Sequence, residues 1–158
     1  MTFEINPAGS TGSFGIESYV QGGSFRVDGD RDAAIWEDVS TARWIAEDAV
    51  RRFQQVLPEI PGAPSVSSYE PAARALVWAG FANRMLGENF CNAVFDGGPL
   101  RPHTDALLRA DSLFSEAIPI AQAVGLDDVA DAALAGRASV RADLATYGLG
   151  AGWSAAAS

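Results

Sequence analysis

Small and apolar side chains recur every three or four residues in two stretches of the chain, residues 69–86 and 104–124, on either side of a polar loop at 87–103. This spacing places such side chains along one stripe of an α-helix. In the second stretch, Ala110, Phe114 and Ala117 match the A-x3-F-x2-A half of a tetratricopeptide unit, in which small residues let a neighbouring helix approach and the aromatic ring fills the gap. We therefore predict a pair of packed helices with Phe114 as its central buried side chain.

The same spacing predicts four principal helices in all, at residues 32–57, 69–88, 104–124 and 127–146. Gly125 is expected to end the third of them. Gly80 and Gly136 hold the same place in a weak internal repeat, and a glycine inside a helix costs about 1 kcal/mol relative to alanine. Its recurrence therefore indicates close contact between helices. The predicted fold is all-α, built of tetratricopeptide-like antiparallel helical hairpins as a fragment of an α-solenoid.

The two ends of the chain lack this periodicity. Residues 1–30 are rich in glycine and are expected to form an irregular, extended or small-hairpin segment, ahead of a helical domain at 31–147. Residues 148–158 are expected to form a loose tail without a capping helix, so the chain is interpreted as a piece of a longer protein. The fourth helix should then expose an apolar patch around Val129, Ala133, Val140 and Leu144.

Charge and composition narrow the classes of partner. The net charge of −9 argues against nucleic acid or an anionic bilayer as the main partner. No stretch is long and apolar enough to cross a bilayer, and no signal peptide is visible after Met1. With one cysteine and one histidine, no intrachain disulfide and no metal-ligand spacing can be recognised. We expect no cofactor and no bound metal.

Catalytic patterns are likewise missing from the sequence, which shows no paired carboxylates, no nucleophile–base set and no phosphate loop. Cys91 and His103 could be imagined as a thiol–imidazole pair, but nothing in the sequence orients them. A buried, inert role for Cys91 is the preferred interpretation. The chain is therefore predicted not to be an enzyme.

The loop at 87–103 is the strongest candidate for partner contact, because long loops in compact folds are often functional. Its polar side chains are Glu88, Asn89, Asp96, Arg101 and His103. The alternative is that residues 96–99 form a simple turn and the rest of the loop packs over the helix ends.

Tryptophan side chains are the other candidates for a ligand site, since their faces can stack on sugar rings. Trp36 and Trp78 lie at or beside the apolar stripes and are assigned to the core. Trp44 lies next to a stripe and is the preferred ligand-facing tryptophan. A helical ion pair is expected between Glu47 and Arg51, four residues apart.

Three segments carry a resemblance to a known family: residues 73–91, which end in Leu86-Gly-Glu-Asn-Phe-Cys91, the turn Asp96-Gly-Gly-Pro99, and residues 109–117. Together they resemble the SusD/RagB family over roughly residues 36–147. The Leu-Gly-Glu-Asn-Phe-Cys and Asp-Gly-Gly-Pro segments make the match more specific than a tetratricopeptide motif alone. Members of that family are longer and begin with a lipoprotein signal and a lipid-bearing cysteine, whereas Cys91 lies in mid-chain.

The resemblance implies a non-enzymatic, substrate-binding component at the outer membrane or cell surface, which captures glycans, peptides or other nutrients for a partner transporter. The family's ligand residues lie mostly outside the region covered, so none is carried over. The alternative is a soluble, cytoplasmic tetratricopeptide-type module that takes a peptide or helix of another protein in its groove.

Overall fold

The computed structural model describes residues 30–150 and 152–156, and residues 1–29, where the extended or hairpin segment was expected, lie outside this part. Four long helices make up most of it: α2 (Asp30–Val56), α3 (Glu70–Asn89), α4 (His103–Ala123) and α5 (Asp127–Thr146). The predicted bounds of the first three helices differ from these by one or two residues, and those of the fourth agree. The all-α class is confirmed. The chain divides into two compact units, residues 1–37 and 38–158, and α2 begins in the first and continues in the second.

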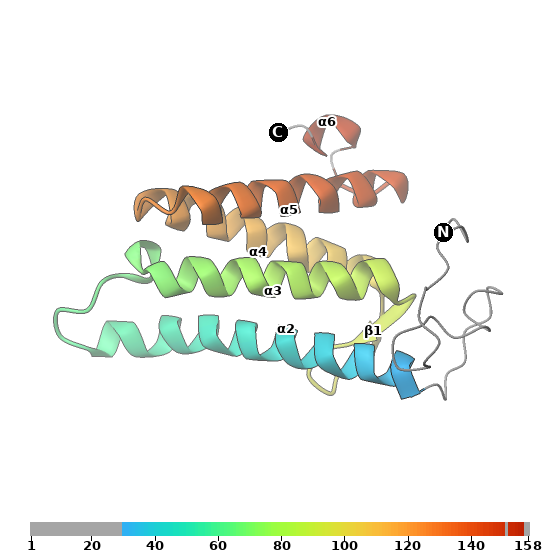
Figure 1. Ribbon diagram of the computed structural model, residues 1–158, viewed down its shortest axis with the longest axis horizontal. Coiled ribbons are helices and arrows are strands. Elements are labelled where there is room, and N and C mark those ends of the chain that lie inside the picture. Colours follow the sequence, from blue (N-terminus) through green and yellow to red (C-terminus); the bar gives the residue numbers. More distant parts are fainter. Residues whose placement is uncertain (1–29, 151, 157–158) are drawn as a thin grey trace, which may run out of the picture. The chain divides into compact units, whose positions relative to one another are not determined.

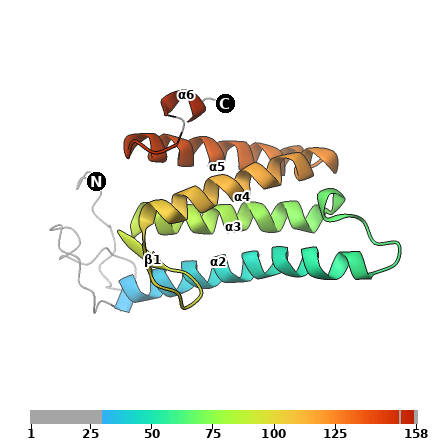
Figure 2. The ribbon, with the colours of Figure 1, turned by 180° about the vertical axis from the view of Figure 1, so that it is seen from behind.

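Short elements connect the long helices. Two 3-10 turns, η1 (Leu57–Glu59) and η2 (Val66–Ser68), lie between α2 and α3, and a last helical turn, α6 (Trp153–Ala156), lies beside α5. In the second unit α2 runs alongside α3, and α4 and α5 follow on the other side of α3, each antiparallel to its neighbour in sequence (Figures 1 and 2). The predicted antiparallel packing of four helices is therefore confirmed.

Helices α4 and α5 end in the same way. Gly125 and Gly148 have φ values of 72° and 69°, a left-handed conformation that glycine adopts without steric cost. The next residues, Leu126 and Leu149, donate their backbone N–H groups to carbonyls five residues back at distances of 2.9 Å. These are Schellman caps, and Gly125 ends its helix as predicted.

Phe114 lies at the centre of the core and is completely buried. Its ring packs against Gly80 of α3 and Gly136 of α5, so closely that a Cβ atom at Gly80 would lie 2.6 Å from the ring. Phe81 meets the same ring edge-on, with 5.0 Å between centroids. The two glycines are needed because any side chain there would overlap the ring, which confirms the close contact predicted from the repeat.

The expected apolar patch on α5 was wrong. Val129, Ala133, Val140 and Leu144 are all buried, with exposed fractions of 6%, 0%, 0% and 3%. They belong to the same apolar cluster as Phe114, because the stripe of α5 faces α4. No further helix is needed to cover these residues.

A two-stranded sheet occupies the loop between α3 and α4, where no strand was predicted. Strand β1 (Asn92–Val94) pairs antiparallel with β2 (Leu100–Pro102), with Ala93 opposite Arg101. Asp96 and Gly97 have positive φ values of 52° and 73°, and Gly98 donates its N–H to the Phe95 carbonyl at 2.8 Å. Asp-Gly favours such a hairpin turn. A turn is therefore present at the tip of the loop, at residues 95–98, one residue earlier than the predicted 96–99.

Candidate functional site

The polar loop residues do not converge on one site, because each interacts with its own surroundings. Glu88 accepts a hydrogen bond from Arg84 one turn earlier on α3, and Asn89 donates to the Met85 carbonyl at 2.9 Å. Arg101 pairs with Asp105 at 2.7 Å. These contacts support the helix ends and the hairpin.

His103 and Cys91 are joined through their backbones and not as a catalytic pair. The His103 N–H donates to the Cys91 carbonyl at 3.1 Å, which continues the strand pairing. The imidazole lies edge-on to Tyr147, 4.7 Å between centroids, and its buried Nε2 has no hydrogen-bond partner in the described part of the chain. Cys91 is exposed, so its expected burial was wrong. Cys91 directly precedes strand β1, in which Ala93 is buried and its two neighbours are exposed.

Asp96 belongs to a charged cluster that connects α2 to the rest of the fold. We call Arg43, Glu47, Asn83, Asp96 and Arg109 the Glu47 cluster. Arg43 donates through Nη1 to Glu47 at 2.9 Å and through Nη2 to Asp96 at 2.8 Å. Asn83 of α3 donates to Glu47 at 2.7 Å, and Arg109 of α4 donates to both Glu47 oxygens, through Nε at 2.8 Å and through Nη2.

Burial makes the Glu47 cluster consequential for stability. Arg43, Glu47 and Asn83 are all buried, so their charges and dipoles must be satisfied within the protein. The Phe95 ring lies 5.4 Å from each of the Arg43 and Arg109 guanidinium carbons, within cation–π range. The hydrogen bond from Arg43 holds the pKa of Asp96 below its usual range, and partial burial opposes this shift.

The pairing of Glu47 differs from the expectation. Arg51 was expected to be its partner, but Arg51 pairs with Asp48 at 3.2 Å, because Glu47 points into the interface and Arg51 lies at the surface. Both carboxylate oxygens of Glu47 are already occupied by donors from three elements. The cluster is therefore suited to holding α2 in place and not to acid–base chemistry.

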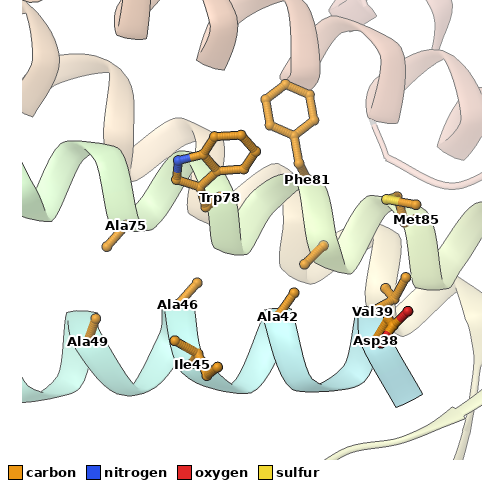
Figure 3. Close-up of a pocket in the computed structure, with 11 residues that line it drawn as sticks. Asp38, Val39, Ala42, Ile45, Ala46, Ala49, Ala75, Trp78, Phe81 and Met85 are labelled. Carbon is orange, nitrogen blue, oxygen red and sulfur yellow. The ribbon is translucent and has the colours of Figure 1, made fainter. Parts of the chain in front are cut away.

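An open apolar pocket of about 560 Å³ lies between α2 and α3, and we call it the groove (Figure 3). Alanines line its two walls: Ala42, Ala46 and Ala49 point from α2 towards α3, and Ala75 points back. Methyl groups are too short to fill the space between the helices. The remaining residues that line the groove are Asp38, Val39, Ile45, Trp78, Phe81, Ala82 and Met85.

Large apolar side chains at the groove are exposed to solvent. The exposed fractions of Ile45, Trp78 and Met85 are 56%, 69% and 46%. Large apolar side chains that gather on an exposed surface are typical of binding sites. Asp38 is the single charged residue among those that line the groove in the described chain.

The assignment of the tryptophans was partly wrong. Trp78 was expected in the core, but it is 69% exposed on the flank of the buried stripe of α3 and lies at the edge of the groove. Trp44, the preferred ligand-facing tryptophan, is 47% exposed but does not line the groove. The signal that could have found the groove is the alanine series at 42, 46 and 49 on α2 opposite Ala75 and Ala82, with large apolar residues beside it.

Neither metal binding nor membrane crossing finds a basis in the described residues. Within residues 30–150 and 152–156, no three His, Cys, Asp or Glu side chains come together as metal ligands. No described helix combines the length and apolar character that a membrane span requires. Comparisons with protein-family models, with curated proteins and with solved structures gave no significant match.

Proposed function

We propose that this chain is a non-enzymatic binding module that docks a protein partner in the groove between α2 and α3. The observation that carries the proposal is the groove itself, with Ile45, Trp78 and Met85 exposed beside alanines that leave its interior unfilled. Exposed aromatic and methionine side chains are enriched at protein interfaces. Following the SusD/RagB resemblance, the module would be the tetratricopeptide-like part of an outer-membrane nutrient-binding protein, and the partner would belong to its transporter assembly.

The chemistry of the groove favours a protein surface over a glycan. Sugar hydroxyls that lose water need hydrogen-bond partners, and an unmet polar group costs about 1–3 kcal/mol. Asp38 is the one charged side chain among the described residues at the groove, and the others are apolar. An apolar side chain, in contrast, gains from leaving water there. Capture of glycans by a complete protein would therefore require surfaces other than this groove.

The soluble tetratricopeptide-type interaction module is the second candidate, and the same observation favours it. It would use the groove in the same way, with a peptide or helix of another protein as ligand. The two candidates differ in location and in the identity of the partner, and not in the binding surface.

A matched pair of tryptophan variants tests the binding surface. A displayed library of helical peptides and a glycan array would be applied to the wild type, to Trp78→Glu and to Trp44→Glu. Trp44 is also an exposed tryptophan but lies outside the groove. We expect selected peptides to lose at least about tenfold in affinity on Trp78→Glu and to be unaffected by Trp44→Glu. Glycan binding without peptide binding, or peptide binding indifferent to Trp78→Glu, would contradict the proposal.

A further inference from the structure

We infer that the occupant of the groove is an amphipathic helix of about three turns from another protein, with a basic side chain next to Asp38. The inference rests on the proposed function, because it names the partner segment that the groove would take. It is drawn from the length of the groove, the size of the side chains that line it and the charges on the two helices that form it.

The length of the groove sets the length of the occupant. On α2 the lining residues extend from Asp38 to Ala49, eleven steps along the helix. At 1.5 Å per residue this is about 17 Å, or three helical turns. Ala75 and Met85 mark a similar length on α3. A helix of about twelve residues lying along the groove would cover it from end to end.

The shape of the groove selects large apolar side chains. Ala42, Ala46 and Ala49 recur at steps of four and three, so the wall of α2 is a row of methyl groups with space above it (Figure 3). A partner helix presents anchoring side chains at i, i+3 or i+4 and i+7, which is the same repeat. Leucine or phenylalanine at those positions would fill the space that the alanines leave open.

The charge at one end of the groove selects a basic residue. Among the described residues of α2 from Asp38 onwards and of α3, every charged side chain except Asp38 forms an ion pair. The pairs are Arg43 with Glu47 and Asp96, Glu47 with Arg109, Asp48 with Arg51 and Arg52, Glu70 with Arg74, and Arg84 with Glu88. Asp38 is exposed at the groove and has no ion-pair partner among the described residues. A lysine or arginine of the partner helix would supply one.

A second copy of this chain is disfavoured as the occupant for the same reason. Each copy carries a net charge of −9, so two copies repel one another at long range. A basic helix, in contrast, is attracted by the whole molecule before it reaches Asp38, and such steering raises the association rate.

Three synthetic helices would test the inference. Each has about twelve residues with leucine at i, i+3, i+7 and i+10, and they differ only in carrying lysine, glutamine or glutamate at both ends. Affinity for the full chain would be measured by calorimetry at low salt. We expect the lysine helix to bind about three- to fivefold more tightly than the glutamate helix, the range of an exposed charge pair.

Charge reversal in the protein provides the matched control. Asp38→Lys should abolish the preference for the lysine helix, whereas Glu116→Lys, the same charge change on an exposed residue of α4 outside the groove, should keep it. Circular dichroism would confirm that both variants keep the helical fold. Trp78→Glu should weaken all three peptides, and the glutamate helix most, because the added carboxylate repels it.

The outcomes separate this inference from the proposed function. If the peptides bind through Trp78 but their order is unchanged by Asp38→Lys, the basic helix is wrong and the groove remains a docking site. If none binds the wild type better than Trp78→Glu, both proposals are wrong. A concentration-dependent dimer in analytical ultracentrifugation that Trp78→Glu abolishes would also overturn the inference, because the occupant would then be a second copy.

Discussion

The two sides of α3 are packed in opposite ways. Towards α4 and α5, glycines at positions 80 and 136 remove every side-chain atom so that the Phe114 ring can fill the space between three helices. Towards α2, alanines face one another across a groove that they do not fill, and the Glu47 cluster connects the helices instead. The first interface is stabilised by close apolar packing and the second by a few directed charge contacts. This difference is the reason why we propose the α2 side as the docking surface.

The largest effect is expected from removing the ring at the closely packed interface. Phe114→Ala should lower the free energy of unfolding by about 3–5 kcal/mol, because it leaves a cavity among three helices. Urea denaturation would measure it, with Trp78→Ala as the control. Since Trp78 is 69% exposed, its loss should change stability by no more than about 0.5 kcal/mol. Equal losses in the two variants would erase the distinction between the interfaces.

Removing Glu47 tests the second interface. Glu47→Ala should lower the free energy of unfolding by about 3 kcal/mol, because the buried Arg43 and Asn83 each lose one acceptor and the Arg43 charge keeps only Asp96 as a partner. Glu70→Ala is the matched control. Its ion pair with Arg74 is exposed on both sides and should be worth less than about 0.5 kcal/mol. Equal midpoints in urea for the two variants would show that the cluster does not hold α2.

A single added methyl group should be costly at the Phe114 interface. Gly136→Ala should lower the free energy of unfolding by about 1–3 kcal/mol, because the new Cβ overlaps the ring. In a Phe114→Leu background the overlap is relieved, and the same change should become neutral or stabilising by up to about 1 kcal/mol from helix propensity. If Gly136→Ala stabilises the wild-type protein, α5 must lie further from the Phe114 ring of α4 than in the structure.

A larger side chain should be tolerated on the groove side. Ala42→Leu adds apolar atoms to unfilled space and should raise the free energy of unfolding by up to about 1 kcal/mol. The same change should weaken the helical peptides, because it occupies part of their site. Thermal unfolding and peptide titration of one variant measure both effects. Destabilisation comparable to that of Gly136→Ala would show that the groove is already filled.

The smallest effects are those of pH, and they have opposite signs on the two sides. The lowered pKa of Asp96 means that its pair with Arg43 stabilises the fold above the ordinary value of 3.8, and that this contribution is lost as the pH falls through the lower, folded pKa. On α5, burial and then the nearby Glu88 carboxylate raise the pKa of Asp143. Its native state therefore binds the proton more tightly, and a penalty develops as the pH rises from 3.8 through the raised pKa.

Asparagine substitutions separate these contributions. At pH 7, Asp143→Asn should raise the melting temperature and Asp96→Asn should lower it. Asparagine is suitable at position 96 because it tolerates the left-handed conformation found there. Well below pH 3.8 both differences should shrink. Melting temperatures from pH 3 to 7 measure this, and two parallel profiles would contradict the assignment of signs.

Local pattern in the sequence was sufficient to predict the four helices, the glycine that ends α4 and the packing around Phe114. The helices and the cap depend on residues within a few turns of one another, whereas Gly80 and Gly136, which contact the Phe114 ring, lie far from it in the sequence and were linked to each other by the internal repeat. An apolar stripe has the period of a helix, and a left-handed cap favours glycine. A series of small, aromatic and small residues predicts a neighbouring helix that leaves space for the aromatic ring. Gly80 and Gly136 could be interpreted because their cost in a helix demands a compensating contact.

Tertiary structure decided which faces are covered, because this depends on the distance between helices that lie far apart in the sequence. The buried face of α5, the exposure of Trp78 and the β1–β2 pair follow from that placement and not from periodicity. Glu47 has an arginine four residues away on either side, yet only Arg43 pairs with it, and its other donors come from positions 83 and 109. The groove is the clearest case. Alanines allow two helices either to touch or to stand apart, and the position of α2, held by the Glu47 cluster, decides between the two arrangements.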